Sequence, residues 1–301
     1  MNMYHNPVIL AECMEGLEIR PEGVYVDLTF GGGGHTREML RRGAGRVFAF
    51  DQDADAERNA REIDDERLTF VRSNFRYMTN WLHYHGITHV DGILADLGVS
   101  SHQFDEVSRG FSFRGDAIVD MRMNQQQKLT ANDILNDYTE EQLADTLYIY
   151  GELKQARRIA AAIVKARQTG KQWTTTELSN VVNPFIGRDR EKKDLARVFQ
   201  ALRIEVNGEM EALREMLEQT VELLKPEGRL VVMTYHSLED RMVKNFMKAG
   251  NIEGHIEKDF YGNVVGAPGI ASKPITASDD EIAMNPRARS AKLRQLTRGV
   301  L

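Results

Sequence analysis

A run of glycines between two predicted elements is the feature of this sequence that most plainly indicates chemistry. The apolar residues Val24 to Val26 are followed by Asp27, and four glycines, Gly31 to Gly34, come next. His35 follows them, and a helical pattern begins near Thr36. Because glycine has no Cβ and tolerates positive φ, a strand, a glycine turn and a helix start let backbone amides approach an adenosine-containing ligand. The alternative is a flexible turn that binds nothing.

The residues around the glycines narrow the kind of ligand. A phosphate-binding P-loop needs a lysine after its last glycine, but His35 holds that position. A dinucleotide-binding loop needs a third glycine where Thr36 stands. Asp27 would repel a pyrophosphate, whereas it suits a cationic cofactor without phosphate. The loop therefore favours S-adenosylmethionine, and a nicotinamide dinucleotide is the more distant alternative.

Two further acidic residues end predicted strands. Asp51 lies about 20 residues after the first glycine, where an acidic residue accepts hydrogen bonds from ribose hydroxyls. An acid at a helix N-terminus is the alternative, and Asp53 fits that role better. Asp96 opens the segment DLGVSS directly after another apolar run. Because ligands of an open α/β sheet lie beyond the carboxyl ends of its strands, we expect Asp27, Asp51 and Asp96 to converge on one rim.

The elements that must position these residues alternate along the first hundred residues and return near the end of the chain. Near-continuous apolar strands joined by helices are typical of a parallel sheet covered on both faces. The predicted strands are 23–28, 46–50, 68–72, 90–96, 229–235 and 291–298. The predicted helices between and after them are 35–42, 53–63, 75–84 and 238–248.

A helical stretch interrupts this alternation. From residue 130 to about residue 204 the sequence has helical periodicity, and one long helix is predicted from Leu202 to Lys225. We therefore expect an α/β fold with an inserted all-α domain. The expected sheet domain is discontinuous and comprises residues 1–108 and 206–301, and the expected helical domain comprises residues 109–205.

Composition bounds the class of protein. The chain has 301 residues and a formal net charge of -6, which argues against a general nucleic-acid binder but allows local basic patches. Cys13 is the single cysteine, so a reducing cytoplasm is the simplest compartment. The first ten residues lack the basic and long apolar regions of a signal peptide, and no apolar run reaches the length of a membrane span. We expect a cytoplasmic protein that contacts no membrane.

Six motifs carry a resemblance to a known family. In order they are DLTFGGGGHT, DLGVSSHQFD, RGFSFRGD…DMRMNQ, FQALRIEVN, YHSLEDRMVK and NPRARSAKLR. With them, the sequence resembles, over nearly its whole length, the ribosomal RNA small-subunit methyltransferase H family, also called MraW. The resemblance implies a class I S-adenosylmethionine methyltransferase with a Rossmann-like, mostly parallel sheet. It also implies methylation of the exocyclic N(4) amine of a cytidine in the decoding region of 16S rRNA. The negative net charge fits an assembled small ribosomal subunit as the substrate, and we expect no metal.

The same resemblance implies particular site residues. The implied cofactor contacts are Gly33, Gly34, His35, Asp51, Phe75, Asp96 and Gln103. Asp96 is also the expected catalytic residue, either accepting from the target amine or holding the amino group of the cofactor. The sequence departs from the family pattern where DGPLDMRM is replaced by DAIVDMRM at 116–123, and where a His-Pro pair before FQALR is replaced by Lys193-Asp194.

Aromatic and histidine side chains give further candidates. Phe104, Phe111 and Phe113 either stack on the target base or pack in the core. His236 follows a strand that should end at the rim, so it is a candidate substrate contact, although Ser237 with Asp240 would explain the segment as a helix cap. A histidine group with metal-like spacing lacks any cysteine or acidic partner, and we interpret its members as surface residues: His83, His85 and His89.

Two groups of cations are candidates for phosphate contact, and solvated helix faces are the alternative. The insert cations are Lys154, Arg157, Arg158, Lys165, Arg167 and Lys171. The tail cations are Arg287, Arg289, Lys292, Arg294 and Arg298. Two other functions stay open: a class I methyltransferase with a different substrate, and a cofactor-dependent ribosome assembly factor whose catalysis is vestigial.

Overall fold

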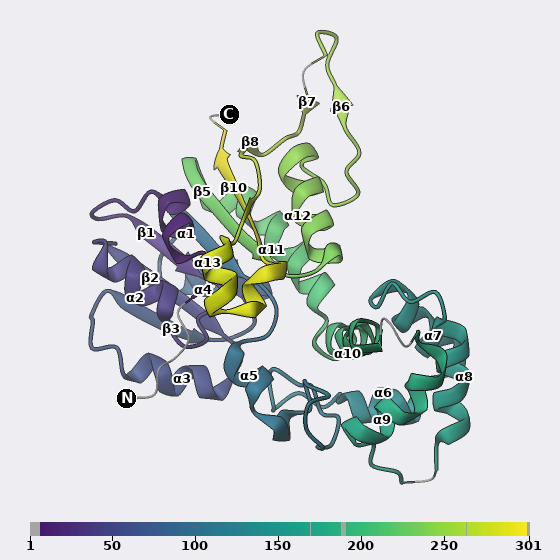
Figure 1. Cartoon of the computed structure of the whole chain (residues 1–301). Helices are drawn as coiled ribbons and strands as arrows, with labels where there is room; N and C mark the ends of the chain where they lie inside the picture. The colour runs from purple at the N-terminus through teal and green to yellow at the C-terminus, as the bar shows by residue number, and fades with distance from the viewer. Residues whose placement is uncertain (1–6, 169, 188–190, 263, 300–301) are drawn as a thin grey trace. The chain divides into compact units, whose positions relative to one another are not determined.

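An eight-stranded sheet forms the centre of the larger of two units (Figure 1). The computed structural model describes residues 7–168, 170–187, 191–262 and 264–299. The sheet unit comprises Met1–Gly98 and Met210–Leu301, and the helical unit comprises Val99–Glu209. The sequence placed the two borders at 108/109 and 205/206. Residues 1–6, which belong to the segment without signal-peptide features, lie outside the described residues.

The sheet has the strand order β3-β2-β1-β4-β5-β10-β8, with β9 also paired to β10. The first five strands run parallel, and β10 runs antiparallel to β5. The strands are β1 (Val24–Asp27), β2 (Arg46–Asp51), β3 (Leu68–Arg72), β4 (Val90–Asp96), β5 (Leu224–Thr234), β8 (Gly269–Ala271), β9 (Ile275–Thr276) and β10 (Lys292–Arg298). The prediction of a mostly parallel sheet is confirmed.

Helices cover both faces of this sheet. Tyr25 and Val26 are neighbours in β1 and are both fully buried, but they belong to different apolar clusters because successive side chains of a strand point to opposite faces. The cluster around Tyr25 includes residues of α1 (Leu10–Leu17) and α2 (Gly34–Arg41). The cluster around Val26 includes residues of α4 (Met78–Tyr84), α11 (Glu209–Leu223) and α12 (Ser237–Ala249).

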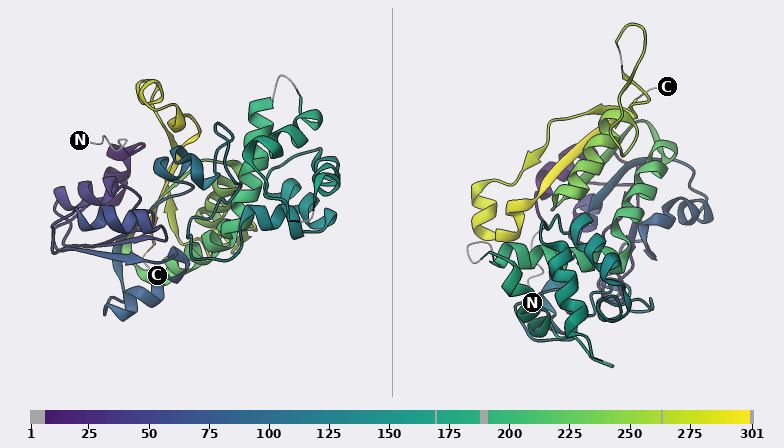
Figure 2. Two further views of the ribbon diagram at one scale, coloured as in Figure 1. Left: turned by 90° about the horizontal axis from the view of Figure 1, so that it is seen from below. Right: turned by 90° about the vertical axis from the view of Figure 1, so that its right-hand side faces the viewer.

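Smaller elements complete the sheet unit. A two-stranded hairpin, β6 (Glu257–Lys258) with β7 (Val264–Val265), projects from the sheet in Figure 1 and in the right panel of Figure 2. Its tip carries Phe260 and Tyr261, which are both exposed and pack edge to face at 5.6 Å between ring centroids. The remaining helical segments are α3 (Ala54–Arg61), η1 (Phe75–Tyr77), α13 (Asp279–Met284) and η5 (Pro286–Ser290).

The helical unit has an apolar core of its own, organised around the fully buried Trp173. The indole N–H donates to Oδ1 of Asn136 at 3.0 Å, and the Trp173 backbone N–H donates to Oδ1 of Asn132 at 2.9 Å, so the ring is both packed and hydrogen-bonded. The elements are α5 (Ser101–Asp105), η2 (Val107–Arg109), α6 (Ala131–Asp137), α7 (Glu140–Ile149), α8 (Ala156–Ala166), α9 (Thr175–Val182), η3 (Asn183–Phe185) and α10 (Glu191–Asn207).

Two local expectations were wrong. The helix predicted from Leu202 to Lys225 is broken at Gly208, whose φ of 58° lies in the left-handed region, and Leu224 already pairs with β4. The cap of α12 is His236 instead of Ser237, because Nδ1 of His236 accepts from the backbone N–H of Glu239. Among the described residues, no helix has the length and apolar character needed to cross a membrane.

Candidate functional site

The glycine loop lies at the carboxyl end of β1, between the ends of β2 and β4. The backbone N–H of Leu28 donates to the carbonyl of Leu94 in β4, and that of Phe30 donates to the carbonyl of Phe50 in β2, each at 2.9 Å. These two hydrogen bonds extend the pairing of β1 with β4 on one side and with β2 on the other. The loop is therefore anchored at the middle of the sheet edge where the three acidic strand ends meet.

Asp27 fixes the loop from inside. Its Oδ2 accepts from the Thr36 hydroxyl at 2.7 Å, and its Oδ1 accepts from the backbone N–H of Thr29 at 3.1 Å. The side chain is fully buried, and burial raises the pKa of Asp27 to about 6, while the bonds from Thr36 and Thr29 act in the opposite direction. Asp27 thus ties the start of α2 to the end of β1.

Asp51 holds the glycine run from the neighbouring strand. Its Oδ2 accepts from the backbone N–H of Gly31 at 2.8 Å, and its Oδ1 accepts from the N–H of Asp53 at 2.9 Å. Burial raises the pKa of Asp51 to about 6, with added repulsion from Asp53 and Asp27. Asp53 is the N-cap of α3, as its position suggested. Asn59 of α3 donates its amide to the Gly31 carbonyl at 2.9 Å, so Gly31 is held from both sides.

Asp96 closes the rim at the end of β4. Its backbone N–H donates to the Thr29 hydroxyl at 2.7 Å, and its Oδ1 accepts from the Tyr235 hydroxyl at 2.8 Å. Burial, with repulsion from Asp27 and Glu239, raises the pKa of Asp96 to about 7, although the bond from Tyr235 works against that rise. A carboxyl group that titrates near neutrality can hold or accept a proton under working conditions.

The glycines and His35 shape the start of α2. Gly33 is the N-cap with a φ of 79°, and a Cβ there would come 2.7 Å from the Phe30 ring. A Cβ at Gly34 would overlap Pro7, so neither position admits a side chain without rearrangement. Burial lowers the pKa of His35 to about 4, so its ring is neutral at physiological pH. A hydrogen bond joins the ring to the Val8 backbone, and among the described residues the buried Nε2 has no hydrogen-bond partner.

Phe75 and Gln103 are the two predicted contacts outside the loop and the acidic rim. Phe75 begins η1 just after β3, is partly buried and packs against the apolar cluster around Val26. Near it, the Asn74 amide donates to Oε1 of Gln52 at 3.2 Å, which links the ends of β3 and β2. Gln103 belongs to α5 of the helical unit, where its Oε1 accepts from the Ser100 N–H at 3.1 Å and closes a capping box.

Two residues of the rim escaped the sequence prediction. Thr29 bridges Asp27 and Asp96, since its backbone N–H donates to the Asp27 carboxylate and its hydroxyl accepts from the backbone N–H of Asp96. Tyr235 follows β5 and bonds Asp96 across 139 positions of sequence. Its place directly after a strand, next to the candidate His236, was a usable signal.

His236, Phe111 and Phe113 have structural roles in this arrangement. His236 forms the reciprocal cap of α12 with the buried Glu239, whose Oε2 accepts from the N–H of His236 at 3.3 Å. Phe111 is buried in the helical core, and Phe113 packs on that core with its ring 5.6 Å from Phe199, which favours packing over base stacking. His83 and His89 are exposed as expected, whereas His85 is half-buried with its ring 5.5 Å from Phe48.

The two basic groups differ in how much charge they leave exposed. In the tail, Lys292 and Arg294 both pair with Asp240, and Arg298 is buried with its guanidinium donating to the Pro268 carbonyl. In the insert, Arg167 is half-buried and donates to backbone carbonyls of α6 and its C-cap. The insert cations that stay exposed, on α8 and just before it, are Lys154, Arg157, Arg158 and Lys165.

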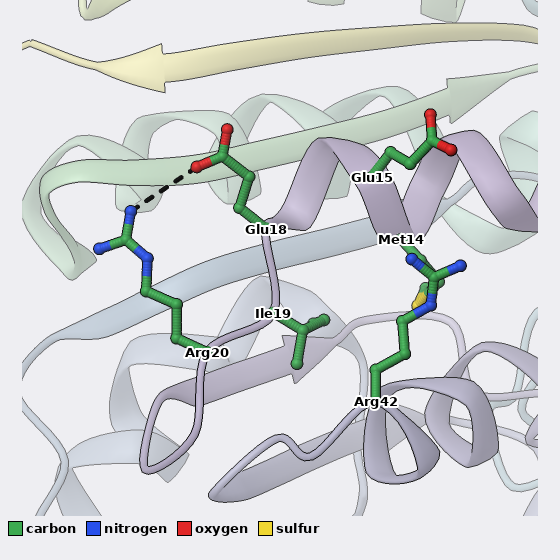
Figure 3. A pocket seen from close by; sticks show the side chains of 6 residues that line it. All are labelled: Met14, Glu15, Glu18, Ile19, Arg20 and Arg42. Atoms are coloured by element: carbon green, nitrogen blue, oxygen red, sulfur yellow. Dashed lines mark ion pairs between the residues drawn. The ribbon is translucent and has the colours of Figure 1, made fainter.

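A pocket elsewhere on the sheet unit contains none of the predicted site residues (Figure 3). It lies between the end of α1, the segment before β1 and the end of α2, at the amino ends of the strands. Arg20 and Glu18 form an ion pair of 3.6 Å across one side of it. Its lining residues are Met14, Glu15, Glu18, Ile19, Arg20 and Arg42.

The strand order of the mostly parallel sheet, with helices on both of its faces, defines a class I methyltransferase fold. A model of the MraW methylase family matches residues 2–299, and the chain belongs to this family. The ribosomal RNA small subunit methyltransferase H of Parabacteroides distasonis is 59% identical over 295 residues, which cover 97% of this chain and 96% of that protein. The protein of the same name from Flavobacterium johnsoniae is 53% identical over 293 residues, with the same coverage. A solved structure, a putative rRNA-methylase from Clostridium thermocellum, has a TM-score of 0.45 and 13% identity over 98% of both chains.

Proposed function

We propose that this protein transfers a methyl group from S-adenosylmethionine to the exocyclic N(4) amine of a cytidine in the decoding region of 16S rRNA. The observation that carries the proposal is the acidic rim around an anchored glycine loop, in a chain whose relatives bear the name of a small-subunit rRNA methyltransferase. We propose the assembled small ribosomal subunit as the substrate and the cytoplasm as the compartment, since the single cysteine needs no oxidising environment.

The residues of the rim suit a cationic adenosine cofactor. S-adenosylmethionine supplies an electrophilic methyl group on a positively charged sulfur. A cation beside Asp27, Asp51 and Asp96 would offset the desolvation that raises their pKa values. Asp51 keeps lone pairs for ribose hydroxyls, and the buried Nε2 of His35 gains a partner from a bound ligand. The proposed contacts remain Gly33, Gly34, His35, Asp51, Phe75, Asp96 and Gln103.

We propose that the helical unit recognises the RNA. Its support is the exposed charge of α8, where Arg157, Arg158 and Lys165 lie opposite the buried Ile159 and Ile163. Exposed cations on one helix face provide sequence-independent phosphate contacts. The negative net charge of the chain then fits a partner that is met through a local patch instead of through the whole surface.

The test is product analysis with Asp96→Ala. Small subunits from cells that lack this protein are incubated with S-adenosylmethionine and enzyme, and the rRNA nucleosides are measured by mass spectrometry. The wild-type protein should form N(4)-methylcytidine, and Asp96→Ala should form none. Asp91→Ala is the matched control, because Asp91 is an acidic residue of the same strand at its opposite end, paired with Lys225 at 2.8 Å. Near wild-type transfer by Asp96→Ala would refute the catalytic assignment, and equal activity on free rRNA would refute the particle as substrate.

A further inference from the structure

We propose that Tyr235 is a positioning residue for methyl transfer, which holds one oxygen of Asp96 and leaves the other to receive a proton from the target amine. This inference rests on the proposed function. The Tyr235 hydroxyl donates to Oδ1 of Asp96 at 2.8 Å. Within residues 7–168, 170–187, 191–262 and 264–299, no donor bonds to Oδ2 of Asp96.

The fold fixes both partners of this hydrogen bond through their backbones. β4 and β5 are parallel neighbours with Asp96 in register with Met233, and the N–H of Leu97 donates to the Met233 carbonyl at 3.0 Å. The Tyr235 N–H donates to Oε2 of Glu239 at 2.9 Å, and the Asp96 N–H donates to Thr29. Because the backbone of each residue is held by a separate hydrogen bond, the phenol and the carboxylate extend from fixed positions on neighbouring strands.

The titratable groups that face Asp96 lie on β1, α12, α1 and the end of β5. Asp27 at the end of β1 and Glu239 in α12 both repel its negative form, and the buried Cys13 of α1 lies near enough for Asp96 to raise the pKa of its thiol. Burial and Asp96 also raise the pKa of Tyr235 well above its ordinary value, so the phenol stays protonated and can donate to Asp96. Tyr235 is the partner that favours the carboxylate form of Asp96.

The hydrogen bond from Tyr235 to Asp96 serves the transfer of the methyl group from sulfur to nitrogen. The amine nitrogen forms a bond to the methyl carbon, and the carbon–sulfur bond breaks with its electron pair remaining on sulfur. One N–H proton of the amine passes to Oδ2 of Asp96, and the Tyr235 O–H bond stays intact. Since only the ionised carboxylate can take the proton, kcat falls on the acid side of the pKa of Asp96.

The decisive measurement is the pH dependence of kcat for Tyr235→Phe on small subunits at saturating S-adenosylmethionine. Loss of the donor should raise the pKa of Asp96, so the acid limb should move upward by about one pH unit, a tenfold loss of kcat on that limb. At alkaline pH the variant should approach the wild-type kcat, and the KM for S-adenosylmethionine should stay within about twofold. A merely structural role would lower kcat equally at every pH.

Two comparisons keep the test decisive. Tyr25→Phe removes another buried phenol hydroxyl, which accepts from the Arg20 N–H at 2.7 Å at the far end of β1, and it should leave the acid limb in place. Replacement of Tyr235 by a difluorotyrosine keeps the ring, strengthens the donor and should move the limb to lower pH, even if Tyr235→Phe folds poorly. If the pH profiles of kcat for Tyr235→Phe and the wild-type protein coincide while N(4)-methylcytidine still forms, the role of Tyr235 is overturned and the proposed function stands. Absence of that product from the wild-type reaction overturns the proposed function and this inference together.

Discussion

Replacing the fully buried Asp27 by asparagine should change the way in which stability depends on pH. In the folded protein, burial holds the pKa of this carboxyl at about 6, above its ordinary value of 3.8. Between these two values the folded state binds more protons than the unfolded state. Asp27 therefore stabilises the fold most below its unfolded pKa, and this contribution is lost as pH rises through about 6.

The expected magnitude follows from the two pKa values, about 6 when folded and 3.8 when unfolded. Integrating the proton uptake of one such group from about pH 5 to about pH 8 gives a loss of about 1.4 kcal/mol in the free energy of unfolding. An asparagine side chain cannot titrate, so Asp27→Asn should be relatively more stable at alkaline pH by that amount, or by about 3–6 °C in Tm. Any loss of the bonds from Thr29 and Thr36 adds an offset that does not depend on pH.

The assay is urea unfolding of the cofactor-free protein at several pH values, with the difference between variant and wild type plotted against pH. Asp145→Asn in α7 is the control for the loss of an exposed carboxylate, and the difference for Asp27→Asn should vary more with pH than the difference for this control. A difference for Asp27→Asn that does not vary with pH would mean that burial does not raise the pKa of Asp27, which would refute the electrostatic description of the rim.

Two further predictions concern the loop and the RNA surface. Gly33→Ala should lower the free energy of unfolding by about 1–2 kcal/mol because its backbone is left-handed, and by more because the new Cβ meets Phe30. This loss of stability should exceed that of Gly43→Ala, where φ is 91° and nothing lies within 4 Å. Calorimetry should also show weaker S-adenosylmethionine binding for Gly33→Ala alone, and equal losses of stability in the two variants would refute the steric role. Replacing the exposed insert cations Lys154, Arg157, Arg158 and Lys165 with glutamine should weaken the salt dependence of binding to single-stranded RNA, so that the slope of log affinity against log salt becomes shallower by up to about 3. The control is Arg58→Gln/Arg61→Gln on α3. An unchanged slope would exclude these four cations as the RNA contact.

The sequence was informative wherever a signal is local. Strand β4 and the strand 68–72 were predicted with their observed bounds. For β4 the signal is a nearly continuous apolar run, which is typical of a buried parallel strand. The convergence of Asp27, Asp51 and Asp96 followed from a general rule about the carboxyl ends of such strands. By contrast, Gly208 interrupts a helical pattern that continues on both sides, and periodicity alone gives no sign of the break.

The sequence by itself therefore determined the class of fold, the anchored glycine loop and the carboxylates beside it, since each depends on neighbouring residues or on strand order. Only the tertiary structure decided what those carboxylates contact. Tyr235 reaches Asp96 because β5 pairs with β4 after the helical unit has intervened, and Asp240 takes up Lys292 and Arg294 because α12 packs near β10. Hydrogen bonds and ion pairs between distant segments depend on side-chain positions in the folded chain, which residue types and spacing do not specify.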